Sequence, residues 1–291
     1  MSSISSSKAN AVLSAERGMA VEIWRWIETP PVDGATQMAT DQAILEHADI
    51  IDCPTMRVYS WQPFCISLGY HQSEDRIDLS RCAGDAIDVV RRPTGGRAVL
   101  HAEEVTYSVI IPHSSPLCGA SISETYARIS QGLAKGIQTL GVPAEMEKRS
   151  IDLHSHYKTS LSVSCFSAAA LSEILVQGKK LVGSAQRRLP SGVLQHGSIL
   201  TGDYHQRLPR YLKDCRPDQC DRMEKIIASK TISIGEYLGQ DVPFGDVAQA
   251  IRKGVTEIFG IRFEDGSLTD EEAAQVEAFR QRFALFSSSD T

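Results

Sequence analysis

Three short segments of this chain combine glycine with charged or titratable side chains, a combination that suits the binding of a ligand. The first, residues 91–101, reads Arg-Arg-Pro-Thr-Gly-Gly-Arg-Ala-Val-Leu-His. Its adjacent glycines, Gly95 and Gly96, allow backbone N–H groups to approach a ligand closely. The neighbouring Arg92 and Arg97 supply positive charge. By itself, a Gly-Gly turn between two strands is more often only a turn, so the function of this segment depends on the others.

The other two segments lie about 90 and 100 residues downstream. Residues 178–186 read Gly-Lys-Lys-Leu-Val-Gly-Ser-Ala-Gln, and residues 194–200 read Leu-Gln-His-Gly-Ser-Ile-Leu. Lysines that follow a hairpin turn are ordinarily solvated charges at a sheet edge. The functional interpretation is that one of them faces inward and polarises a carbonyl. A histidine inside a strand, such as His196, is as often a core or edge side chain as a functional one.

In this order, the three segments resemble the motifs of the lipoate–protein ligase, octanoyltransferase and biotin ligase superfamily. Its members show Arg-Arg-x-x-Gly-Gly ending in His, then Lys-x-x-Gly-x-Ala, then His-Gly-Ser/Thr-Ile/Leu-Leu. The resemblance extends over about residues 24–200, and it implies that the glycine-rich loop and the lysine strand line a tunnel for an acyl chain. The matching candidate positions for acyl or substrate binding are Arg92, Gly95, Gly96, Arg97, His101, Gly183, Ala185, His196 and Gly197.

The residues upstream of the lysine segment favour one branch of this superfamily. ATP-dependent lipoate ligases usually carry Asn-Asp just before the lysine hairpin, where this chain has Ser172-Glu173. Cys165, in the sequence Ser-Cys-Phe, instead resembles the nucleophile of the cysteine-dependent octanoyltransferases. Arg97 stands where the ligase-type loop has a third glycine, which also fits the transferase branch. The resemblance therefore implies that Cys165 and Lys180 are catalytic.

A cysteine nucleophile is chemically consistent with acyl transfer that needs no ATP. Passing an acyl group from a carrier thioester to an enzyme cysteine keeps the acyl group activated for attack by an amine. The thiolate is the nucleophile, and a thiol with a pKa near ~8.5 needs a nearby positive charge. Lys180 is the candidate for that charge, and it could also stabilise the oxyanion. Most free cysteines are inert buried thiols, so the assignment of Cys165 depends on its position relative to the three motifs.

The general base and one motif position stay open. His101 and His196 are both candidates to take the proton of the incoming amine, and nothing in the sequence chooses between them. Many relatives have an acidic or polar residue after the motif histidine, where this chain has Ala102. If that residue has a role, the role passes to Glu103 or Glu104, or is absent.

The resemblance implies an enzyme, an acyltransferase that moves octanoate from octanoyl acyl carrier protein to a lysine of a lipoyl domain or of the glycine cleavage H protein. We expect no metal and no cofactor. The first alternative, an ATP-dependent lipoate–protein ligase, would need ATP, whereas the second, an amidotransferase, would pass the acyl group between lipoyl proteins. A catalytically inactive acyl-binding relative is the alternative outside enzymes, and a biotin ligase fits less well than any of these.

Periodicity predicts the elements that must position these residues. The clearest helix spans residues 121–140, with an apolar stripe at spacings of three and four; further helices are predicted at residues 38–48, 246–259 and 270–283. Strands are predicted at residues 21–27, 56–61, 65–69, 87–91, 105–111, 173–176, 180–183 and 193–200. Because the strands come in runs of hairpins rather than alternating with helices, the pattern predicts a single α+β domain with a largely antiparallel or mixed sheet flanked by helices.

Composition limits the function classes. The net charge of −6 gives no sign of nucleic-acid binding. No apolar run approaches the ~18 residues of a membrane span. Seven cysteines, an odd number without a compact framework, favour free thiols in a reducing compartment, and we expect a cytoplasmic protein. His205, Cys215 and Cys220 do not have the spacing of a zinc site.

The expected domain organisation is simple. The Ser-rich residues 1–20 are expected to be a disordered tail, since they lack the apolar stretch of a secretory signal. A transit peptide is the alternative for that tail. Residues 21–265 are expected to form the catalytic domain, and residues 266–291 a C-terminal helix.

Overall fold

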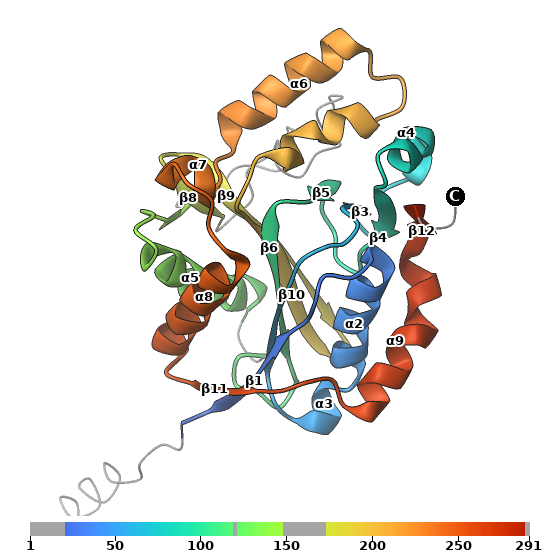
Figure 1. The fold of residues 1–291 in the computed structure, drawn as a ribbon. Helices are drawn as coiled ribbons and strands as arrows, with labels where there is room; N and C mark the ends of the chain where they lie inside the picture. The colour runs from blue at the N-terminus through green and yellow to red at the C-terminus, as the bar shows by residue number, and fades with distance from the viewer. Residues whose placement is uncertain (1–20, 119–120, 148–172, 289–291) are drawn as a thin grey trace, which may run out of the picture.

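The computed structural model describes residues 21–118, 121–147 and 173–288 (Figure 1). The expected tail, residues 1–20, and Cys165 lie outside these ranges. The strands are β1 (Ile23–Glu28), β2 (Thr55–Tyr59), β3 (Cys65–Leu68), β4 (Asp88–Arg91), β5 (Val99–His101), β6 (Glu104–Ile111), β7 (Glu145–Met146), β8 (Ile174–Val176), β9 (Lys179–Leu189), β10 (Gly192–Leu200), β11 (Arg262–Asp265) and β12 (Ala284–Phe286). The helices are α2 (Gly34–Glu46), α3 (Ala48–Ile51), η1 (Glu74–Arg76), α4 (Leu79–Gly84), α5 (Ile122–Gln138), η5 (Tyr204–Tyr211), α6 (Pro217–Lys230), α7 (Ile234–Leu238), α8 (Phe244–Phe259) and α9 (Asp270–Phe283).

The described strands form two sheets. The larger has the order β11-β1-β2-β6-β10-β9-β8-β7, and the smaller has the order β12-β4-β3-β5. In the larger sheet β11, β1 and β2 are parallel, and the pairs from β2 to β7 are antiparallel. The fold is therefore α+β with mixed sheets, as the run of predicted hairpins indicated.

Helices cover both faces of the larger sheet (Figure 1). On one face α5 and α8 bury apolar residues such as Leu133 and Ile251 against the sheet, and this layer forms the main core. On the other face α2 packs beside α9, where Met38 lies in one apolar cluster with Phe279 and Phe283. A third cluster joins the smaller sheet to η5 and α6. The two sheets are thus held in a fixed relation by separate apolar layers.

Local signals explain the ends of the best-predicted helices. The Ser121 hydroxyl accepts the N–H of Glu124 at the start of α5. At the start of α9, Thr269 and Glu272 form a reciprocal capping box, and this helix has the predicted bounds. The turn between β8 and β9 has positive φ at Gln177 (51°) and Gly178 (75°), which confirms the predicted tight hairpin.

Some expectations differ from the structure. The strand predicted at residues 180–183 extends through Leu189, because each residue after Gly183 still pairs with β10 up to the Gly192 turn. Helix α6 was not predicted from the sequence, because most of its residues are polar and only two side chains are buried. Cys215 and Cys220 are paired in a disulfide, so the expectation of free thiols is wrong for this pair, whereas Cys53, Cys65, Cys82 and Cys118 are free. Within the described ranges, no helix has both the length and the apolar character of a membrane span.

A buried histidine attaches η5 to the end of α6. The Nε2 atom of His205 lies 2.9 Å from the Thr231 hydroxyl, and burial lowers the pKa of His205 to about 4. The His205 imidazole is therefore protonated near pH ~6.5 in the unfolded chain, but only near its lowered pKa in the folded chain. The stability that the neutral, buried His205 gives to the fold is therefore fully present above pH ~6.5 and is lost as the pH falls towards 4.

We predict that His205 removes about 3 kcal/mol of unfolding free energy between pH 7 and pH 4. Urea unfolding at several pH values measures it. The comparison is with His205→Asn, whose amide can still bond Thr231 but does not titrate. The difference in unfolding free energy between the two proteins should shrink on acidification. Parallel curves for the two proteins would contradict the prediction.

Candidate active site

A narrow cavity of about 40 Å³ lies where the two sheets meet. Its lining comes from both sheets, from α2 and from the loop after β4. Of the nine positions predicted to bind acyl group or substrate, six line it: Arg92, His101, Gly183, Ala185, His196 and Gly197. The other lining residues are Met38, Tyr59, Trp61, Ser67, Val99, Thr106, Ser184 and Ser198. The structure thus brings the glycine-rich segment together with two segments about 90 and 100 residues downstream.

Arg92 organises the glycine-rich loop from inside. Its guanidinium donates to the carbonyl of Ser67 (2.9 Å), and also to the carbonyls of Gly95 (2.8 Å) and Arg97 (2.7 Å). Gly95, Gly96 and Arg97 do not line the cavity. The buried guanidinium of Arg92 instead holds the carbonyls of Gly95 and Arg97, so Arg92 fixes the shape of the loop.

Two glycines in this region are required by close approach. A Cβ atom on Gly69, which follows β3, would lie 2.1 Å from the carbonyl oxygen of Gly96. Gly96 itself has φ of 96°, in the region that residues with a side chain rarely adopt. The predicted loop and the end of β3 therefore touch through backbone atoms alone.

The first histidine of the site, His101, lies between a carboxylate and a hydroxyl. Its Nδ1 is 2.7 Å from Glu104 Oε1, and its Nε2 is 2.7 Å from Ser67 Oγ. A carboxylate only accepts hydrogen bonds, so Nδ1 carries a proton. Trp61 stacks on the imidazole with ring centroids 4.2 Å apart. The ring is thus fixed in both orientation and hydrogen bonding.

Glu104 is ionised in spite of its burial. Burial would raise its pKa, but the charge of His101 and hydrogen bonds from His101, Thr106 and Ser198 hold the pKa below its usual value. All three partners reach the same oxygen, Oε1. These partners also line the cavity, so the Glu104 carboxylate supports its wall.

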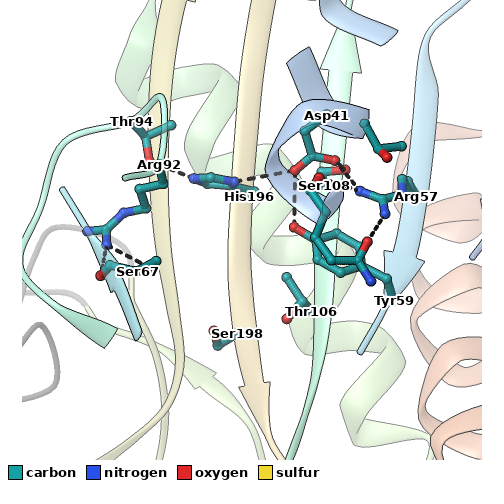
Figure 2. A network of polar contacts seen from close by, with 12 residues as sticks. Asp41, Arg57, Tyr59, Ser67, Arg92, Thr94, Thr106, Ser108, His196 and Ser198 are labelled. Carbon is teal, nitrogen blue, oxygen red and sulfur yellow. Dashed lines mark hydrogen bonds and ion pairs between the residues drawn. The ribbon is translucent and has the colours of Figure 1, made fainter. Parts of the chain in front are cut away.

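The second histidine, His196 on β10 of the larger sheet, also lies between a carboxylate and a hydroxyl (Figure 2). Its Nδ1 lies 3.5 Å from Asp41 Oδ2, and its Nε2 lies 2.6 Å from the Thr94 hydroxyl. Burial lowers the pKa of His196, against the pull of Asp41, so the imidazole is neutral at pH 7. A neutral ring with Nδ1 protonated accepts the Thr94 hydroxyl at Nε2. Asp41 on α2 thereby reaches the glycine-rich loop through His196.

Asp41 also neutralises a buried guanidinium. Arg57 Nη1 donates to Asp41 Oδ1 at 2.7 Å, and neither side chain is exposed. Ser108 and Tyr59 donate to the same carboxylate at 2.8 and 3.1 Å (Figure 2). Burial would raise the pKa of Asp41, but Arg57, His196 and Ser108 hold it below its ordinary value. The site is therefore supported from α2 and β2 by a charged, closed network.

The predicted catalytic lysine, Lys180, is buried but is not among the residues that line the cavity. Lys180, on β9, pairs with Glu173 through a Nζ–Oε1 contact of 2.5 Å. It precedes Gly183, which lines the cavity, by three residues. The predicted nucleophile, Cys165, lies outside the described residues, so its distance from Lys180 is not part of this geometry.

Several residues of the site carried no clear signal in the sequence. Asp41 lies in a helix far from the motifs, and Ser67 and Trp61 lie in or beside strands of ordinary composition. Thr94 lies within the glycine-rich segment but is not one of its motif positions. In the sequence, Glu104 was only one candidate to replace the acidic or polar residue that many relatives have at the position of Ala102. Its contact with His101 is consistent with such a replacement.

The chain is similar in sequence to proteins of known family. A model of the lipoyl protein ligase A/B catalytic domain matches residues 33–256. The protein Octanoyltransferase LipM of Clostridioides difficile is 38% identical over 262 residues, which are 89% of this chain and 96% of that protein. The protein of the same name from Moorella thermoacetica is 38% identical over 271 residues, which are 91% and 97% of the two chains.

Solved structures of ligases share the fold. A bi-partite lipoate protein ligase from Thermoplasma acidophilum, described with its E2 lipoyl domain, matches with a TM-score of 0.72 at 20% identity, over 90% of this chain and 93% of that one. A lipoate-protein ligase A bound with ATP matches with a TM-score of 0.68 at 21% identity, over 89% and 94% of the two chains. At these identities the likeness concerns the fold alone.

Proposed function

Because this chain belongs to the lipoyl protein ligase A/B catalytic-domain family, we propose that it is an octanoyltransferase of protein lipoylation. It moves an octanoyl group from acyl carrier protein to a lysine of a lipoyl domain or of the glycine cleavage H protein. The observation that carries the proposal is the cavity that three separate motifs line together. The similarity to octanoyltransferases over most of both chains supports it.

The octanoyl chain is proposed to occupy this cavity. Most of its wall is apolar or aromatic, and at ~0.8 kcal/mol per buried methylene an eight-carbon chain gains several kcal/mol. The cavity is narrow, so the chain enters only if lining side chains move. Met38 suits this role, because its side chain is unbranched and has three rotatable bonds.

The acyl group is proposed to pass through a thioester on Cys165. The thiolate attacks the carrier thioester, a new C–S bond forms, and the carrier thiol leaves. The acceptor amine then attacks the enzyme thioester, an amide forms, and the Cys165 thiol is released. This assignment is supported by the sequence alone, through the position of Cys165 upstream of the lysine segment. Lys180 is proposed to supply the positive charge that favours the thiolate and the oxyanion.

Arginines near the glycine-rich loop are proposed to attract the acidic carrier protein. Arg187 donates to the carbonyl of Pro93 and lies over the Tyr70 ring, 4.3 Å from its centroid. Tyr70 is 47% exposed, so this pair lies at the surface next to the loop. The cytoplasmic location expected from the sequence stays a proposal.

A transfer assay without ATP tests the proposed function. The enzyme is mixed with octanoyl acyl carrier protein and an unmodified lipoyl domain, and intact masses are followed over time. We expect the lipoyl domain to gain one octanoyl group. A lipoyl domain whose target lysine is replaced by arginine is the matched control, and it should gain none.

Two results would contradict this function in different ways. Transfer that starts only when ATP and free octanoate or lipoate are added would make the protein a ligase. Transfer that starts only from an octanoylated lipoyl protein, and not from the carrier protein, would make it an amidotransferase. Because the three donors are supplied separately, each outcome is read from the same mass spectrum.

A further inference from the structure

A carboxylate, an imidazole and a hydroxyl lie in a row at the wall of the acyl cavity. Glu104 Oε1 is 2.7 Å from His101 Nδ1, and His101 Nε2 is 2.7 Å from Ser67 Oγ. Ser67 and His101 line the cavity, whereas Glu104 is not part of its lining. In such a row a histidine can take the proton of a hydroxyl, and the carboxylate stabilises the imidazolium that forms. The row is therefore suited to move a proton out of the cavity.

The hydrogen bonds of Ser67 set the direction in which its proton points. The guanidinium of Arg92 donates to Ser67 Oγ at 3.0 Å (Figure 2), and a guanidinium cannot accept. Since His101 carries its proton on Nδ1, where Glu104 accepts it, Nε2 is an acceptor and the Ser67 hydroxyl donates to it. A hydroxyl oxygen has two lone pairs, and Arg92 uses one of them. The second can accept the N–H of a substrate in the cavity.

The hydrogen bonds of His196, the other histidine of the cavity, lead in a different direction. Its Nε2 contacts the hydroxyl of Thr94, which is fully buried and does not line the cavity. Its carboxylate partner, Asp41, is already neutralised by Arg57 at 2.7 Å. A proton of a substrate in the cavity therefore has no hydroxyl route to His196, and a charged His196 would share its carboxylate with a guanidinium.

Glu104 has a different set of partners. Among the described residues, its hydrogen bonds come from His101, Thr106 and Ser198, and of these three only the imidazole can become positive. The carboxylate is buried, so it interacts strongly with a charge that is only 2.7 Å away. A proton that reaches His101 thus creates an ion pair with a carboxylate that no lysine or arginine contacts.

Strand register places His101 towards the proposed oxyanion group, Lys180. Ser198, which lies 3.2 Å from His101 Nδ1, pairs across β10 and β9 with Gly183, three residues after Lys180. His196 precedes Ser198 by two residues, so its partner on β9 is two residues further from Lys180. Because each residue adds roughly 3.3 Å along a strand, His101 is the histidine on the lysine side of the cavity.

From this geometry we infer that Ser67 and His101 form a proton relay for the acceptor lysine, and that Glu104 holds the imidazolium. This inference rests on the proposed function and supplies the base of its amide-forming step. As the neutral amine nitrogen bonds to the acyl carbon, its N–H proton passes to Ser67 Oγ and the Ser67 proton passes to His101 Nε2. The C–S bond then breaks, its electron pair stays on the Cys165 sulfur, and the imidazolium returns the proton to that sulfur.

Chemical rescue separates proton transfer from a structural role. The rate of octanoyl transfer to the lipoyl domain is measured with and without added imidazole. His101→Ala removes the ring and leaves space for imidazole, so the rate should fall at least ~10²-fold and imidazole should raise it again by at least ~10-fold. His196→Ala is the matched comparison, because its ring also lines the cavity and is similarly buried. Any loss of rate in that variant should not respond to imidazole.

Two further variants cover the case in which His101→Ala fails to fold, which its melting temperature reveals. His101→Asn keeps a donor for Glu104 but cannot take up a proton, so kcat should fall by at least ~10²-fold. Ser67→Ala breaks the relay at its other end and should lower kcat by at least ~10-fold. KM for the lipoyl domain should change by less than ~3-fold in both, because the relay acts on a proton and not on binding. His113→Asn changes a histidine that is 45% exposed and does not line the cavity, and it should keep both constants.

The relay is wrong if His101→Asn or Ser67→Ala keeps the wild-type kcat, or if folded His101→Ala does not respond to imidazole. It is also wrong if imidazole restores His196→Ala instead. Failure of the proposed function has a different sign, since wild type then acylates the lipoyl domain only from ATP and free acid, or only from another lipoyl protein. The same variants are then compared with that donor, because these reactions also form an amide and release an amine proton. A wild type inactive with every donor would overturn both proposals.

Discussion

Replacing Cys165 by alanine should lower octanoyl transfer without ATP by at least ~10³-fold, since removal of a catalytic nucleophile has effects of this size or larger. The alanine cannot form a thioester, so both halves of the reaction stop together. The rate of octanoyl gain by the lipoyl domain measures the loss. The mass of the enzyme itself, after incubation with octanoyl carrier protein alone, shows whether the acyl group is attached to it.

The control for this experiment is another cysteine that the site does not use. Cys53 is a free, half-buried thiol just before the start of β2, and it does not line the cavity. Cys53→Ala should keep the octanoyl adduct and the full rate. If Cys165→Ala keeps the rate, or if the adduct depends on Cys53 instead, the proposed thioester on Cys165 is wrong. Acylation of the lipoyl domain only with ATP would point to the ligase reaction.

Replacing Asp41 by alanine should destabilise the protein by roughly 3–5 kcal/mol, the cost of leaving one member of a buried ion pair without its partner. Arg57 would keep its charge in a fully buried position and lose its 2.7 Å contact. Ser108 and Tyr59 would lose an acceptor at the same time. The free energy of unfolding in urea measures the change, followed by the fluorescence of the buried tryptophans.

The matched control is an exposed ion pair of the same type. Asp265 contacts Arg252 at 2.7 Å, but its side chain is 76% exposed. Such pairs contribute about 0–1 kcal/mol, so Asp265→Ala should be nearly neutral. Asp41→Asn should lie between the two, because its amide still accepts from Arg57. An equally small effect of Asp41→Ala would show that the network around Arg57 adapts to the loss, contrary to this prediction.

Residues of the site differ in how far a sequence could predict them. Arg92, His101, Gly183 and His196 were identified because they belong to segments with a recognisable order. Asp41 could not be identified in this way, because an aspartate is usually solvated, and only the packing of α2 in the fold buries it. Glu104 was one of two neighbouring acidic residues, and only the alternation of side chains along β6 decides which of them faces His101.

The sequence by itself determined the family, the α+β class, four of the helices, most of the strands, and the three segments that line the acyl cavity. These features follow from local spacing: periodicity, helix caps, a Gly-containing turn and the order of short motifs. The tertiary structure decided which side chains complete the site. The hydrogen bonds of His101 and His196 and the buried pair of Asp41 and Arg57 all join residues from different elements. Contacts of this kind depend on how sheets and helices pack, which spacing along the chain does not specify.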